Sequence, residues 1–173
     1  MVKRKRPQLV IVDVIGTTPS RMTAKIIEVA VIQIFDRTTH RSYSSMINPL
    51  TSFAPVGSLN EESVENAPYF AEIATIIQRK ICHKGAVILG DNLTNYSLPL
   101  LDQAFCDGGC PPDWTDITFI DLLHEVQREF GRESTPWTIY EQLTGKSLPK
   151  LETALARCHG CLDLISTLVP DYV

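Results

Sequence analysis

The first third of the chain carries apolar runs that predict three neighbouring strands. Residues 9–15 read Leu-Val-Ile-Val-Asp-Val-Ile, an apolar run with one acid in it, which is typical of a central strand buried on both faces. Residues 25–35 predict a second strand, and the polar stretch 36–41 turns the chain into a third over 42–47. The three strands predict an antiparallel meander. The acid, Asp13, would be buried there and needs a partner or a function.

The remainder of the chain alternates helical spacing with two short apolar strands. Glycine and proline mark the breaks, with Gly85, Gly145 and Pro170 as the expected helix ends. The expected strands are 86–89 and 117–120, and the expected helices are 68–81, 97–105, 122–130, 136–143 and 150–168. Together these elements predict an α/β fold with a mixed five-stranded sheet and helices packed on its faces.

Length and composition favour one folded domain. A chain of 173 residues with 44% hydrophobic residues can bury a core without disulfides, and its five cysteines are an odd number, so reduced thiols are expected. No apolar stretch is long enough to cross a bilayer, so we expect no membrane partner and an intracellular, cytoplasmic location. The expected division is a basic arm over 1–8 and the folded domain over 9–173.

The net charge of −4 gives no overall attraction to nucleic acid, so any such attraction has to be local. The local candidate is the run Lys3, Arg4, Lys5 and Arg6, closed by a proline. Such a run can lie along phosphates or act as a nuclear address, and it can equally be a solvated tail.

Several motifs together resemble the DnaQ-like (DEDDh-type) 3′-to-5′ exonucleases. Residues 9–32 resemble the first exonuclease motif, Asp-x-Glu-Thr-Thr-Gly followed by an Ile-Ile-Glu-Ile strand, with Asp13 at the first acid and Thr17 at the second threonine. Residues 43–49 resemble the third strand with its Val-Asn-Pro ending, and 60–72 resemble the helical segment that follows. The resemblance spans about 9–169 and implies a ribonuclease-H-like fold.

The resemblance also implies a two-metal nuclease whose four carboxylates hold Mg²⁺ or Mn²⁺, with a histidine as base. Asp13 falls on the acid that bridges both metals. Two residues on, Ile15 stands where the family has a glutamate, and its side chain offers no oxygen ligand. One ligand is therefore missing from an alignment that contains no gap.

The second family motif, His-Asn-x-x-Phe-Asp, has its counterpart in 89–96, where Tyr96 takes the place of the acid. A shift of one residue puts Ser97 there instead. Neither side chain is a carboxylate, and Asp91 or Asp102 would have to reach the site from another position.

The third family motif, His-x-x-x-x-Asp, resembles 158–163, with Cys158 at the histidine and Asp163 at the acid. His159 is the next residue but points about 100° away around a helix, so it is a poor substitute base. Two acids, Asp13 and Asp163, remain in this alignment, enough for one weakly held Mg²⁺ or Mn²⁺. The alternative for both acids is a buried polar pair or a contact with structural water.

The sequence is compatible with three functions. The first is a catalytically impaired exonuclease fold that binds single-stranded DNA or RNA, or a replication, repair or defence protein. The second is an active metal-dependent exonuclease that uses Asp13, Asp91 and Asp163, and the third is a protein-protein adaptor. The nucleic-acid contacts predicted for the first are Lys3, Arg4, Lys5, Arg6, Thr17, Asn92 and Tyr96.

A zinc site is an alternative that we consider less favoured. The pairs Cys158–Cys161 and Cys106–Cys110, with His159 or His83, contain the right ligand types. In a fold of this family the two pairs would sit on different helices, and cysteine is also a common small apolar residue in cores.

Overall fold

The structure is a computed structural model that describes residues 9–36, 39–147 and 151–168. Its five strands form one sheet in the order β3-β2-β1-β4-β5. The strands are β1 (Leu9–Gly16), β2 (Ile26–Asp36), β3 (Thr39–Met46), β4 (Val87–Gly90) and β5 (Thr118–Asp121). β1, β2 and β3 pair antiparallel, whereas β4 pairs parallel with both β1 and β5. The predicted mixed five-stranded α/β fold is confirmed.

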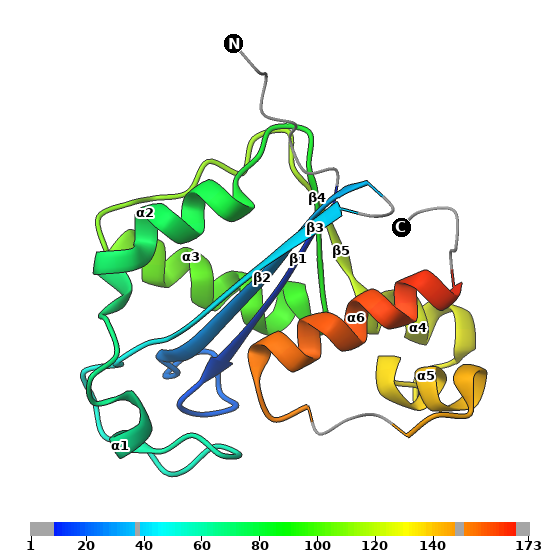
Figure 1. The fold of residues 1–173 in the computed structure, drawn as a ribbon, viewed down its shortest axis with the longest axis horizontal. Coiled ribbons are helices and arrows are strands. Elements are labelled where there is room, and N and C mark those ends of the chain that lie inside the picture. The colour runs from blue at the N-terminus through cyan, green and yellow to red at the C-terminus, as the bar shows by residue number, and fades with distance from the viewer. Residues whose placement is uncertain (1–8, 37–38, 148–150, 169–173) are drawn as a thin grey trace.

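Helices cover both faces of the sheet (Figure 1). The helices are α1 (Glu61–Val64), α2 (Phe70–Ile81), α3 (Leu98–Asp107), α4 (Leu122–Phe130), α5 (Pro136–Thr144) and α6 (Ala154–Leu168), and a π-helical turn, η1 (Leu93–Ser97), leads into α3. α2 and α3 lie on one face and α4, α5 and α6 on the other (Figure 1). None of the helices in the described part of the chain has the length and apolar character that a membrane span requires.

The alternation of side chains along β1 divides the core into two layers. Ile11 and Ile15 pack on the side of α6, and Val10, Val12 and Val14 pack on the side of α2 and α3. Because β1 is covered on both faces, all eight of its residues are buried, as the apolar run predicted. Asp13 shares the odd-numbered register of Ile11 and Ile15, so its side chain lies on the α6 face.

The last helix begins later than expected, at Ala154 rather than at residue 150. The reason is a side-chain cap: Thr153 Oγ1 accepts a hydrogen bond from the Ala156 backbone N–H at 3.1 Å. Residues 148–150 lie outside the described residues. This start sets which side chains of α6 face the sheet.

Other boundaries also differ from the sequence prediction, and β3 starts at Thr39, within the stretch expected to form the turn, rather than at residue 42. α2 starts at Phe70 rather than at residue 68, because the Glu72 carboxylate accepts the Tyr69 backbone N–H at 2.8 Å and the Glu72 backbone N–H donates to the Tyr69 carbonyl oxygen at 3.0 Å. The π-helical turn η1 was not predicted, and it follows Asn92, which adopts the left-handed conformation at φ 49°. π-helical turns are rare in proteins overall, and those that occur are often found at functional sites.

Candidate functional site

Asp13 lies near the carboxyl end of the central strand and is only 5% exposed. Ser97 Oγ donates a hydrogen bond to Asp13 Oδ1 at 3.2 Å, whereas Oδ2 is buried without a hydrogen-bond partner among the described residues. Desolvation raises the pKa of Asp13 from 3.8 to about 7, against the opposing effect of the Arg157 charge. A buried carboxylate oxygen without a hydrogen bond indicates a site in which the negative charge is incompletely balanced.

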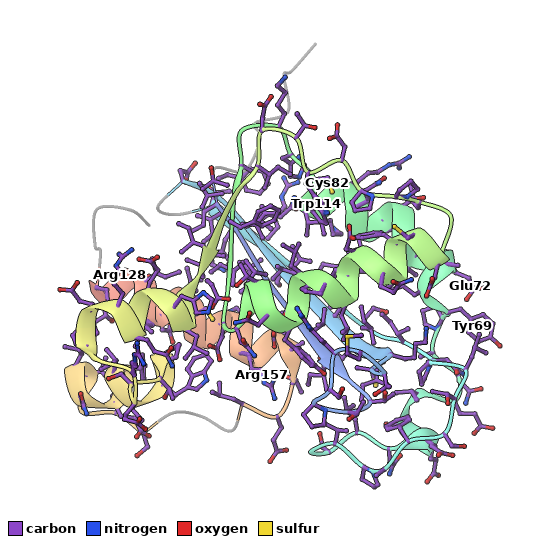
Figure 2. All side chains as sticks on the ribbon, turned by 180° about the vertical axis from the view of Figure 1, so that it is seen from behind. Tyr69, Glu72, Cys82, Trp114, Arg128 and Arg157 are labelled. Atoms are coloured by element: carbon purple, nitrogen blue, oxygen red, sulfur yellow. The ribbon has the colours of Figure 1, made fainter. Side chains whose placement is uncertain are left out.

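Arg157 is the charged side chain of α6 that lies beside Asp13. Its Nη1 lies 3.7 Å from Asp13 Oδ2, and its Nε donates a hydrogen bond to the Leu151 carbonyl oxygen at 3.1 Å. Figure 2 shows Arg157 on the early turns of α6. The last helix therefore presents a cation to Asp13, where the resemblance implied a second acid.

Ile15 lies on the same face of β1 as Asp13 and is 3% exposed within the α6 layer of the core. Its partner across the ladder is Glu28 of β2, whose carboxylate accepts the Ala154 backbone N–H at 3.1 Å. Glu28 thus satisfies the first turn of α6 and supports the position of that helix. Burial raises the pKa of Glu28, and the hydrogen bond from Ala154 opposes this shift.

Cys158 and Cys161 also face the sheet, and both are buried. The Cys158 thiol donates to the Ala30 carbonyl oxygen at 3.7 Å, and burial raises the pKa of both thiols well above the ordinary value. Such thiols are protonated at neutral pH, which does not suit a base or a metal ligand. Asp163 and His159 are exposed, and Asp163 follows Cys161 by about 200° around the helix. The structure does not bring Asp163 to Asp13.

Of the two candidates for the second acid position, Ser97 touches Asp13 and Tyr96 turns to the loop after β1. The Tyr96 hydroxyl donates to the Thr18 carbonyl oxygen at 2.7 Å. Thr17 Oγ1 accepts the Lys25 backbone N–H at 3.1 Å, so Thr17 closes the base of the same loop. Thr17 and Tyr96, predicted as nucleic-acid contacts, both have hydrogen bonds within the protein.

Asp91 follows strand β4, Asp121 is the last residue of the parallel strand β5, and the two carboxylates lie near one another. Burial raises the pKa of Asp91, the charge of Asp121 adds to this, and a hydrogen bond from Trp137 opposes it. Asp121 accepts both the backbone N–H and the hydroxyl of Thr94 at 2.7 Å, so its oxygens hold η1 in place. Asp102, in contrast, is exposed on α3 and accepts the Trp114 indole N–H at 3.0 Å.

The two cysteine pairs considered for zinc lie on different helices on opposite faces of the sheet. Cys158 and Cys161 belong to α6, whereas Cys106 is exposed on α3 and Cys110 follows that helix. His83 Nε2 lies 3.0 Å from Gln33 Nε2, beyond the end of α2. These residues do not converge. The basic run from Lys3 to Arg6 lies outside the described residues.

The donor set around Asp13 does not fit a two-metal centre. In the described part of the chain, no three side chains of His, Cys, Asp or Glu come together in a way that could hold a metal ion. The groups that act on Asp13 are a hydroxyl from Ser97, protonated thiols, the Arg157 guanidinium and one further carboxylate, Asp91. A pair of divalent ions needs several oxygen anions, and a fixed positive charge beside Asp13 opposes them.

The sheet order and the flanking helices define a ribonuclease-H-like fold. Solved structures of exonuclease I share it. One of them superposes with a TM-score of 0.78 at 14% identity, covering 94% of this chain and 41% of that chain. E. coli exonuclease I in complex with a dA16 oligonucleotide gives 0.76 at 14% identity, with 94% and 41% coverage.

The zinc-bound form of the E. coli exonuclease I complex with single-stranded DNA gives a TM-score of 0.75 at 16% identity, covering 96% of this chain and 42% of that chain. This chain thus spans about two fifths of the length of these proteins, and at this identity the likeness concerns the fold. No protein-family model and no curated protein sequence matches the chain.

Arg157 and Glu28 are the site residues that sequence reasoning did not assign, whereas Ser97 was one of two alternatives for the second acid position. The buried stripe of α6 carries a signal for Arg157, because Ala154, Cys158, Cys161 and Ile165 follow helical spacing and Arg157 borders that stripe. The choice of Ser97 over Tyr96 had no comparable signal, since the π-helical turn changes the spacing after β4.

Proposed function

We propose that this chain binds single-stranded nucleic acid at the Asp13 end of its sheet and does not hydrolyse it. The observation that carries the proposal is the Arg157 guanidinium 3.7 Å from the buried Asp13 carboxylate. Hydrolysis by two metal ions requires oxygen anions on both sides of the scissile phosphate. Here Ile15, Ser97 and Arg157 supply an apolar side chain, a neutral hydroxyl and a cation.

The resemblance in fold supports the choice of ligand. Exonuclease I was solved with single-stranded oligonucleotides such as dA16. A fold of this kind without metal ligands can still bind a strand, because contacts to phosphates and bases do not depend on hydrolysis.

The loop between β1 and β2 offers side chains for such a strand. It lies at the same end of the sheet as the start of α6 (Figure 1). Arg21 is exposed and donates to the Asn95 carbonyl oxygen at 3.4 Å, which ties the loop to η1, and Met22 beside it is 84% exposed. Arg21 is thus a cation within reach of a phosphate, and Met22 is an apolar group next to it.

The test is fluorescence anisotropy with labelled single-stranded DNA and RNA in the presence of EDTA. We expect binding that weakens roughly tenfold or more between about 50 and 200 mM salt, because phosphate contacts release counterions. Arg21→Glu is expected to weaken binding by about tenfold at the lower salt concentration.

Arg128→Glu is the matched control, because Arg128 is exposed on α4 and pairs with Glu125 there (Figure 2). The affinity of Arg128→Glu for the labelled strand should stay within about twofold of the wild-type affinity. Absence of binding to either nucleic acid at low salt would refute the proposal and direct the search to a protein partner. Equal losses of affinity in Arg21→Glu and Arg128→Glu would show that the strand does not bind at the loop between β1 and β2.

A further inference from the structure

Three carboxylates on different strands and loops share one arginine. Asp13 on β1, Glu28 on β2 and Asp91 after β4 each have the charge of Arg157 among the interactions that lower their pKa. All three pKa values are nevertheless raised by burial. The cluster is therefore one of desolvated acids around a guanidinium.

The guanidinium is held in place on both sides. Arg157 Nε donates to the Leu151 carbonyl oxygen at 3.1 Å, just before α6 begins, and Nη1 lies 3.7 Å from Asp13 Oδ2. Asp13 Oδ2 is buried and has no hydrogen-bond partner among the described residues. The nearby positive charge of Arg157 balances its negative charge. Glu28 fixes the first turn of α6 through Ala154, which keeps Arg157 at this depth.

We propose that Arg157 is a built-in counter-ion that takes the place of a metal ion in the Asp13 cluster. A divalent cation brought next to Asp13 would meet the guanidinium within a few ångströms in a poorly solvated site, where like charges repel strongly. Replacing Arg157 by an acid removes this repulsion and adds an oxygen ligand beside Asp13 and Asp91. The cluster then becomes a site for a hard divalent cation such as Mn²⁺. This inference does not depend on nucleic-acid binding.

The experiment measures Mn²⁺ binding by calorimetry and the melting temperature in Mn²⁺ and in EDTA, on the full chain. Wild type is expected to melt at the same temperature in both solutions. Arg157→Asp is expected to bind one Mn²⁺ per chain at least about tenfold more tightly than wild type and to melt higher with Mn²⁺ than with EDTA. Arg157→Lys, which keeps the charge, should behave as wild type.

Two controls locate the effect. Arg128→Asp places the same new acid on the surface of α4 and should gain no Mn²⁺ binding. Adding Asp13→Asn to Arg157→Asp should abolish the gain, since Asp13 supplies the buried oxygen. If Arg157→Asp does not fold, as judged by circular dichroism, Arg157→Gln replaces it and should show the same gain in a weaker form.

Either of two results would overturn the inference. One is tight Mn²⁺ binding by wild type that Asp13→Asn removes, because Arg157 would then coexist with a metal. The other is a folded Arg157→Asp or Arg157→Gln variant that binds Mn²⁺ no better than wild type.

Discussion

The Asp13→Asn variant is expected to gain stability relative to wild type as the pH rises. Its free energy of unfolding minus that of wild type should be about 4 kcal/mol larger at pH 8 than at pH 4. The folded protein raises the pKa of Asp13 from 3.8 to about 7, chiefly by desolvation. Between these values the folded state binds more protons than the unfolded state, so wild-type stability from this group falls as pH rises from about 4 to about 7. Asparagine does not titrate and escapes this loss.

Urea unfolding of wild type and of Asp13→Asn between pH 4 and pH 8 measures the difference in their free energies of unfolding. Asp163→Asn is the matched control, because its carboxylate is exposed on α6 and the substitution should change the difference by less than about 1 kcal/mol. A flat difference for Asp13→Asn would mean that Asp13 is fully ionised in the folded protein, which contradicts the desolvated site described above.

Gly90→Ala is expected to cost about 3 kcal/mol of stability, as an overpacked core position does. A Cβ at Gly90 would lie 2.5 Å from the Val12 carbonyl oxygen, and that oxygen belongs to the central strand. The backbone of β1 cannot move away without disturbing its pairing with β2 on the other side. Urea unfolding measures the loss as a lower midpoint at an unchanged slope.

Gly108→Ala is the comparison for this substitution. Its added Cβ would lie 3.1 Å from the Ala104 carbonyl oxygen at the end of α3, so a loss of about 1 kcal/mol or less is expected. Equal stability of Gly90→Ala and wild type would show that β4 and β1 are not spaced as described. The position given for Asp91, which follows β4, would then be wrong as well.

The fold could be predicted from the sequence because its signals are local and strong. The apolar run over 9–15 indicated a strand buried on both faces, and Ile15 follows Asp13 by two residues on the same face of that strand. The resemblance places the second acid of the family motif at Ile15, and the two-residue spacing explains why Ile15 lies on the same face of β1 as Asp13.

The last helix shows why the rest of the site could not be predicted. Its faces depend on where it starts, and each residue of error rotates the assignment by about 100°. The pattern ending in Asp163 suggested an acid at the site, yet the helix starts after Thr153 and turns Arg157 to Asp13 instead. The choice between Tyr96 and Ser97 depended in the same way on a π-helical turn that no spacing rule foretells.

We propose that this fold binds a strand without cutting it, and the most direct test is the fate of an end-labelled single strand. The full chain, in excess over labelled DNA or RNA, is incubated with Mg²⁺ or Mn²⁺ and the strand is sized on a denaturing gel, with exonuclease I as the positive control. We predict that the strand remains full length while anisotropy reports it bound. Shortened products that EDTA suppresses and Asp13→Asn abolishes would contradict the account.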